Sequence, residues 1–159
     1  MLNYELRFLI FVKLYKRMGE NTMIEFTENM MIGVPHIDAQ HREMVGFLNK
    51  SLELCNANPT REEIEAGLNF LASYVTTHFR DEEELQIECN YPNYQRHKEK
   101  HEAFVESFLA LKSTYANENV SPERLAYMLV QEVMIWVVEH VEGEDIEFGR
   151  YYNQVKGTA

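Results

Sequence analysis

Residues 91–101 read YPNYQRHKEKH, and this stretch joins an interruption between two helices to the start of a histidine-bearing helix. Asn90 and Pro92 interrupt any helix that arrives from the N-terminal side. Beyond the break, aromatic, apolar and histidine positions recur at alternating steps of three and four, as on one face of a helix. They are Tyr94, His97, His101, Phe104, Phe108, Leu111 and Tyr115. The stretch therefore predicts a helix with two imidazoles on its buried face, because residues four apart project together.

The same periodicity extends outward from this stretch in both directions. On the N-terminal side, Thr60 and Glu63 form a capping-box pattern that opens a second helix. Its stripe is Ile64, Leu68, Leu71, Val75, His78, Glu82 and Leu85. On the C-terminal side, Ser121 and Pro122 supply a cap and a first-turn proline for another helix. Its stripe is Leu129, Val133, Trp136 and His140.

A further helix is predicted from Ile37, after an irregular segment that contains Gly33 and Pro35. Asp38 suits the cap or the first turn. The stripe is Ile37, His41, Met44, Leu48, Leu52 and Cys55. No run alternates with a period of two as a strand would. Four helices of about 20 residues with short connections predict an all-α, up-down-up-down four-helix bundle.

We assign residues 23–159 to this single domain and residues 1–22 to an N-terminal extension. The extension has a net charge of +2, whereas the whole chain has −11. Two interpretations remain open for it. Either Met1 corresponds to an upstream start codon and the natural protein begins near Met18 or Met23, or the segment is a short amphipathic helix that docks on the bundle or on a partner. N-terminal sequencing of the native protein distinguishes them.

Composition limits the partners and the compartment. A net charge of −11 argues against nucleic acid or an anionic membrane as a partner, because both would repel the chain. The apolar run at residues 8–12 is too short to span a bilayer. Two cysteines, Cys55 and Cys89, make no disulfide framework. They favour a reducing, cytoplasmic location with free thiols.

Five of the six histidines lie on the predicted core-facing stripes: His41, His78, His97, His101 and His140. A single histidine on an apolar face is most often a core residue that hydrogen-bonds to the backbone. Five of them across four helices would each need a separate partner, whereas one shared metal centre satisfies all five. Glu82 lies four residues after His78 and adds a carboxylate to the same face.

A second carboxylate is expected near His140. Glu144 follows at the α-helical spacing of four residues, and spacing alone favours it. Asp145 lies five residues on and requires the helix to loosen, for example at Gly143. Five imidazoles and two carboxylates exceed the ligands of one ion, so we expect two ions of iron, manganese or zinc. The Glu-x-x-His pattern of ferritin-like di-iron proteins is absent, since no histidine follows a glutamate by three residues.

Four ordered motifs carry a family resemblance: GVPHIDAQH ending in His41, HFRDEEE from His78, YPNYQRHKEKH at residues 91–101, and HVEGED from His140. Together they resemble the hemerythrins, most closely the single-domain bacteriohemerythrins, over about residues 23–155. The family usually has methionine where this chain has Gln86, so we expect a more polar pocket. The sixth histidine, His36, matches no ligand of the family and is expected in an exposed loop before the first helix.

The resemblance implies a role for each site residue. One iron would be bound by His97, His101 and His140, and the other by His41 and His78. Glu82 and Asp145 would bridge the two ions, so the family pattern replaces Glu144 by Asp145. With an oxo or hydroxo bridge, the Fe2+/Fe3+ pair is six- and five-coordinate, and the open position would take dioxygen.

The implied function is reversible dioxygen binding for storage, transport or delivery, without catalysis. A protein that accepts the oxygen is a possible partner, and a monomer or small homo-oligomer is expected. Two alternatives use the same centre: a di-iron oxidase, peroxidase or nitric-oxide reductase, or an iron or oxygen sensor module. The enzyme ranks lower because no acid–base residue beyond the ligands is evident.

Overall fold

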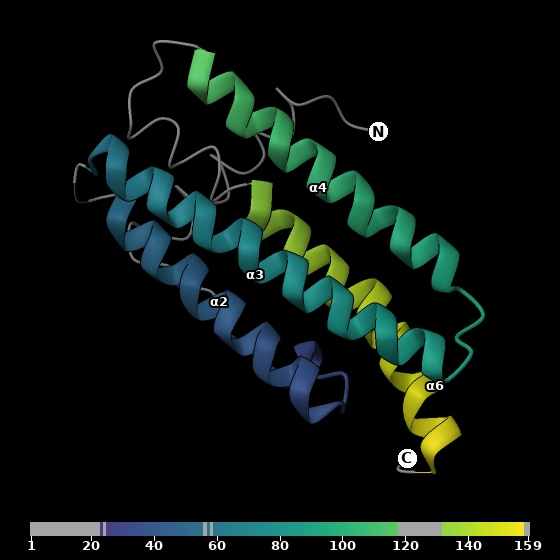
Figure 1. Cartoon of the computed structure of the whole chain (residues 1–159). Helices are drawn as coiled ribbons and strands as arrows, with labels where there is room; N and C mark the ends of the chain where they lie inside the picture. The colour runs from purple at the N-terminus through teal and green to yellow at the C-terminus, as the bar shows by residue number, and fades with distance from the viewer. Residues whose placement is uncertain (1–22, 24, 56, 58, 118–131, 158–159) are drawn as a thin grey trace.

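A computed structural model describes residues 23, 25–55, 57, 59–117 and 132–157 (Figure 1). These residues form a short 3₁₀ helix η1 (Glu28–Met30), then α2 (Pro35–Cys55), α3 (Arg61–Glu88) and α4 (Tyr94–Asn117). A fourth helix follows: residues 132–140 are helical and continue through the π-helical turn η2 (Val141–Asp145) into α6 (Ile146–Lys156). The extension at residues 1–22 and the predicted cap at Ser121 and Pro122 lie outside the described residues.

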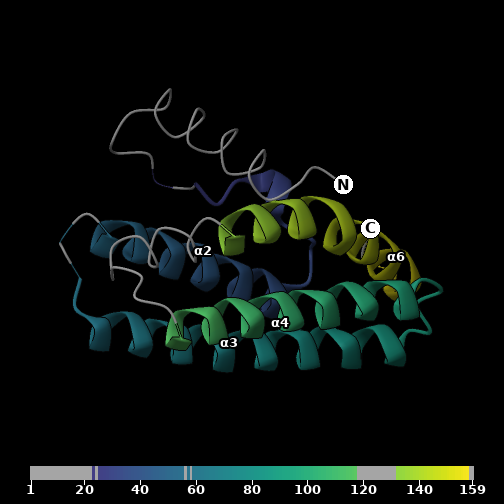
Figure 2. The same cartoon turned by 90° about the horizontal axis from the view of Figure 1, so that it is seen from above.

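The four long helices alternate in direction, so each is antiparallel to the next along the chain (Figure 1). Viewed from above, α2 and the fourth helix lie over α3 and α4 (Figure 2). The described part of the chain contains no strand. None of its helices is both long enough and apolar enough to cross a membrane. The predicted all-α, up-down-up-down bundle is confirmed.

Local sequence signals account for two of the helix starts. The Thr60 hydroxyl accepts a hydrogen bond from the Glu63 amide at 3.2 Å, and the Glu63 carboxylate accepts one from the Thr60 amide at 2.8 Å. This is the predicted capping box. Helix α2 begins at Pro35 rather than at Ile37, because a proline has the fixed φ that suits the first helical position. His36 therefore lies in the first turn of α2 and not in a loop.

Two apolar clusters lie at different levels of the bundle. The larger one contains Met44, Val75, Phe104, Val137 and other side chains from all four helices. The smaller one contains Ile37, Cys89, Tyr91 and Phe148 with Ile32 and Val34. Along each helix, the histidines of the predicted stripes lie between residues of one cluster and residues of the other. The imidazoles therefore form a polar layer that is closed by apolar side chains above and below.

Candidate metal centre

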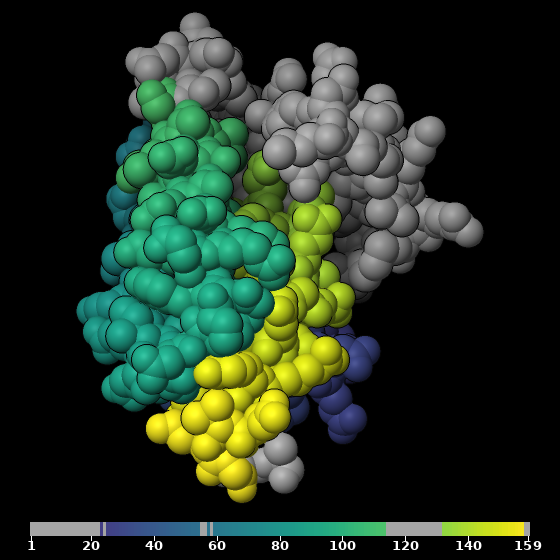
Figure 3. All heavy atoms as spheres, turned by 90° about the vertical axis from the view of Figure 1, so that its right-hand side faces the viewer, coloured from purple at the N-terminus to yellow at the C-terminus, as the bar shows by residue number. Residues whose placement is uncertain are grey.

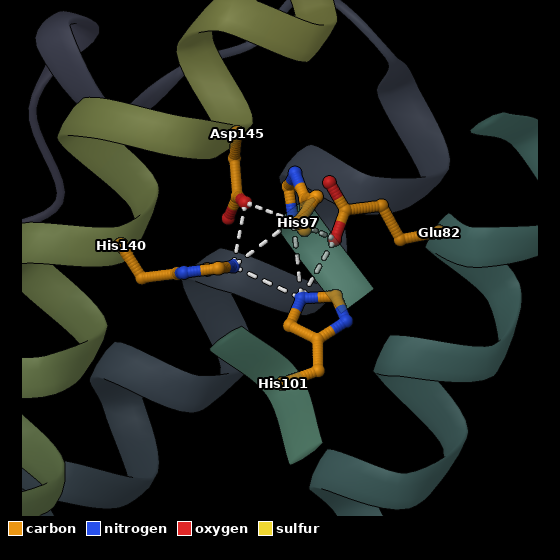
Figure 4. A group of neighbouring side chains, drawn as sticks. All are labelled: Glu82, His97, His101, His140 and Asp145. Carbon is orange, nitrogen blue, oxygen red and sulfur yellow. Dashed lines mark hydrogen bonds and ion pairs between the residues drawn. The ribbon is translucent and has the colours of Figure 1, made fainter. Parts of the chain in front are cut away.

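All five histidines of the predicted stripes are buried in this layer. The side chains of His97, His101 and His140 point toward one another from α4 and the fourth helix (Figure 4). The Nε2 atom of His101 lies 2.9 Å from that of His140, and the Nε2 atom of His97 lies 3.1 Å from both. Three ring nitrogens thus converge on one point.

Two fully buried carboxylates border this point. Oδ1 of Asp145 lies 3.0 Å from Nε2 of His140 and 3.2 Å from Nε2 of His97. Oε2 of Glu82 lies 3.3 Å from Nε2 of His97 and 3.4 Å from Nε2 of His101. Together these five residues offer ligand atoms that all lie within 4.8 Å of one another.

A second group lies beside the first and shares Asp145 with it. Its members are His41, His78 and Asp145, whose ligand atoms also lie within 4.8 Å of one another. Oδ2 of Asp145 is 3.2 Å from Nε2 of His41, while Oδ1 faces the first group. The structure therefore brings all seven predicted residues together in two adjoining groups, with one carboxylate between them.

The π-helical turn η2 explains why Asp145 faces the cluster. The amide of Ile146 donates to the carbonyl of Val141, five residues earlier. Such a turn is wider than an α-helical turn, and it brings residues five apart onto one face. Asp145 consequently lies beside His140. Glu144 instead accepts from Arg96 at 3.0 Å and from Lys100, outside the cluster. The choice of Glu144 from spacing alone is therefore wrong, because that spacing assumes α-helical geometry throughout.

The cluster contains buried polar atoms that the protein does not satisfy. Among the described residues, both ring nitrogens of His41, Nδ1 of His97 and both oxygens of Glu82 and of Asp145 have no partner in hydrogen-bond geometry, although the carboxylates lie within 3.4 Å of ring nitrogens. Each such atom costs about 1–3 kcal/mol if it stays unpaired. Imidazole nitrogens and carboxylate oxygens are donors that suit iron and other first-row metal ions. The residues present therefore fit a pair of bound metal ions.

Opposite pKa shifts distinguish two of the rings in the metal-free protein. Burial alone would lower the pKa of His97, but the adjoining carboxylates of Asp145 and Glu82 outweigh it and raise the pKa to about 10. His78 lacks so close an acid, and burial, with the charge of His41, lowers its pKa to about 4. A neutral ring is the form that binds a metal ion.

These shifts predict the protonation states of the metal-free protein. At pH 8 His97 should carry protons on both ring nitrogens, because its pKa of about 10 lies above the solution pH. At pH 6 His78 should be neutral, whereas an ordinary histidine with a pKa of about 6.5 is mostly protonated. Spectra of ¹⁵N-labelled histidine side chains measure both states. Two rings that each titrate near pH 6.5 would contradict the prediction.

Aromatic side chains enclose the rings. Phe79 stacks on His101 with ring centroids 3.7 Å apart, and Trp136 stacks on His140 with centroids 4.2 Å apart. Phe104 packs in turn against Trp136. These ring contacts are not evident from the sequence, although Trp136 lies one turn before His140 on the same stripe. The stacking holds the planes of the imidazole rings in place.

On the surface, α4 adjoins the fourth helix (Figure 3). Arg96 of α4 pairs with Glu144 and Glu147 at 3.0 Å each, and Lys100 pairs with Glu144. These ion pairs are half-exposed, and each contributes about 0–1 kcal/mol. Their position is informative nevertheless, because they tie η2 to the helix that carries His97 and His101.

Comparison with known proteins gives a consistent result. Residues 32–152 match the family profile described as Hemerythrin HHE cation binding domain. The chain is 30% identical to a bacteriohemerythrin of Stenotrophomonas maltophilia over 135 residues, which cover 84% of this chain and 82% of that protein. It is 26% identical to a bacteriohemerythrin of Clostridium acetobutylicum, covering 79% and 98% of the two chains. A myohemerythrin of Theromyzon tessulatum is 24% identical, with 78% and 89% covered.

Proposed function

This chain belongs to the hemerythrin family, and on that basis we propose that it binds dioxygen reversibly at a non-haem di-iron centre. The observation that carries the proposal is the pair of buried groups that share Asp145, with unpartnered carboxylate oxygens and converging ring nitrogens. The protein would serve in oxygen storage, transport or delivery, without catalysis. A cytoplasmic location, an oxygen-accepting protein partner and a monomer or small homo-oligomer remain predictions.

Each site residue has a proposed role. His97, His101 and His140 would hold one iron, and His41 and His78 would hold the other. Glu82 and Asp145 would supply the carboxylate ligands of the pair. Two iron ions held in this way would supply the electrons and the binding position that reversible binding of dioxygen requires.

The surrounding residues would keep the centre dry and its ligands fixed. Phe79 and Trp136 hold the planes of His101 and His140 by stacking. In the metal-free protein His97 should carry a proton on both ring nitrogens at neutral pH, because the adjoining carboxylates raise its pKa to about 10, and it must release one proton to act as a ligand. Among the described side chains of the polar layer we find no further carboxylate or imidazole placed to donate protons to a substrate. An oxygen-binding role is therefore favoured over an oxidase or reductase.

Exposure of the reduced protein to oxygen tests the function. The iron-loaded protein is reduced without oxygen, exposed to oxygen and then placed under vacuum while its absorption spectrum is followed. Reversible binding predicts a coloured complex that returns to the colourless state over several cycles. Rapid turnover of a reductant, or permanent oxidation in the first cycle, would instead support the enzyme alternative.

Gln86 provides a separate prediction about the polarity of the site. Its side chain is fully buried on α3, one turn after Glu82, and neither amide atom has a partner among the described residues. Gln86→Met should raise the free energy of unfolding of the metal-free protein by about 1–2 kcal/mol, because the unpaired amide is removed. It should also slow autoxidation of the iron-loaded protein. Urea unfolding and the decay of the oxygenated spectrum measure the two effects, and an unchanged autoxidation rate would contradict the second.

A further inference from the structure

Three consecutive acids on α3 have different surroundings. Asp81, Glu82 and Glu83 are each rotated by about 100° from the previous one around the helix. Glu82 faces the cluster, and its neighbours are only partly exposed, at 18% and 19% of their side-chain surface. Glu84, by contrast, faces solvent. Asp81 and Glu83 are therefore not simply solvated members of an acidic run.

Asp81 connects to His78 through Gln40 of α2. The Gln40 amide nitrogen donates to Oδ2 of Asp81 at 2.8 Å, and the Gln40 amide oxygen lies 3.0 Å from Nδ1 of His78. Arg80 donates to the other oxygen of Asp81 at 2.8 Å, and the ring of His36 lies 3.1 Å from Oδ2. This chain of contacts runs from the surface to one ring of the buried layer.

The direction of these hydrogen bonds determines the tautomer of His78. A carboxylate can only accept, so the amide nitrogen of Gln40 must face Asp81 and the amide oxygen must face His78. An amide oxygen also only accepts, so Nδ1 of His78 must carry the proton. The neutral ring is then left with its lone pair on Nε2, the nitrogen available to the cluster.

Glu83 contacts the ring of His101 of α4 in the same way as Gln40 contacts the ring of His78. Its Oε1 atom lies 3.0 Å from Nδ1 of His101, and its Oε2 atom lies 3.7 Å from the Lys98 ammonium. Here the acceptor is a carboxylate rather than a neutral amide. A charged acceptor draws the Nδ1 proton more strongly, which makes Nε2 a stronger donor to a metal ion.

We propose that Gln40 and Glu83 are positioning residues that fix the tautomers of His78 and His101 and give these two rings unequal donor strength. His101 is the stronger donor because it faces a carboxylate, and His78 is the weaker donor because it faces an amide. The effect on metal affinity rests on the proposed di-iron site. The assignment of the tautomers does not rest on that site, because the hydrogen bonds that fix them are present in the metal-free protein.

Tautomers can be read in the metal-free protein at pH 7 from ¹⁵N-labelled histidine side chains. The wild type should show the His78 proton on Nδ1, and Gln40→Met should move it at least partly to Nε2. Glu83→Gln retains an oxygen acceptor and should leave the His101 proton on Nδ1. A wild-type His78 that carries its proton on Nε2 would overturn the proposal even if the Gln40 variant fails to fold.

Cobalt(II) is the probe for donor strength, with affinities measured by competition with a chelator. Gln40→Met and Glu83→Gln should each weaken cobalt binding about 10- to 100-fold. The matched control is Glu84→Gln, which removes the neighbouring exposed acid and should change the affinity by less than about threefold. If both variants bind cobalt as the control does, the unequal donor strength is disproved. A wild type that binds no cobalt would refute the proposed site, while the spectra would still decide the tautomers.

Discussion

Asp145→Asn should reduce the iron content of the purified protein from about two atoms per chain to well below one. The carboxylate is fully buried and is the one member shared by the two groups of candidate ligands. Its oxygens face His41 on one side and His97 and His140 on the other. Asparagine keeps the shape of the side chain but removes its charge and one of its two acceptor oxygens. Both halves of the centre should therefore lose a ligand together.

Glu144→Gln is the matched control for this variant. Glu144 is the adjacent acid, and it pairs with Arg96 and Lys100 rather than with the cluster. Its neutralisation should leave about two irons per chain and lower the free energy of unfolding by no more than about 1 kcal/mol. Elemental analysis of folded protein distinguishes the two variants. Iron loss in Glu144→Gln with retention in Asp145→Asn would reverse the assignment of the second carboxylate.

Gly149→Ala should lower the free energy of unfolding by about 2–3 kcal/mol. Gly149 lies in α6, where an added Cβ would come within 2.3 Å of the Ile32 carbonyl oxygen and 2.6 Å of the Ile32 Cβ. The carbonyl belongs to the backbone and already accepts a hydrogen bond from Asn153 at 3.0 Å. Relief would require α6 to move away from the segment before α2. Urea unfolding of the metal-free protein measures the loss.

Gly46→Ala is the control for a glycine-to-alanine change within a helix. An added Cβ at Gly46 of α2 would meet no atom within 4 Å. Alanine there should stabilise the protein by about 0.5–1 kcal/mol, because glycine is the poorer helix former. A Gly149→Ala variant as stable as the wild type would show that α6 does not pack as closely as described.

The bundle was predictable because one kind of signal repeats on every helix. Stripes with a period of 3.6 residues placed five histidines and Glu82 on buried faces, and breaks such as Pro92 separated the helices. The cap at Thr60 was also predictable, because it depends only on two residues that are three apart in the sequence. The start of α2 was misplaced by two residues, since Pro35 indicates either a loop or a first helical position.

The parts that the sequence did not predict depend on departures from α-helical geometry or on contacts between helices. The position of Asp145 requires a π-helical turn, and Gly143 does not explain that turn sterically, because an added Cβ there would meet no atom within 4 Å. The pairing of Gln40 with His78 depends on how α2 is rotated against α3. No spacing within one helix indicates that rotation. The resemblance of the sequence motifs to the hemerythrins supplied Asp145 where spacing favoured Glu144.

Elemental analysis of the folded wild-type chain tests the di-iron site most directly. The protein is purified without added chelator, its folded concentration is determined, and its iron is counted alongside manganese and zinc. The buried layer predicts about two iron atoms per folded chain, held by His41, His78, Glu82, His97, His101, His140 and Asp145. One metal ion per chain, or none after reconstitution with ferrous iron, would contradict the site.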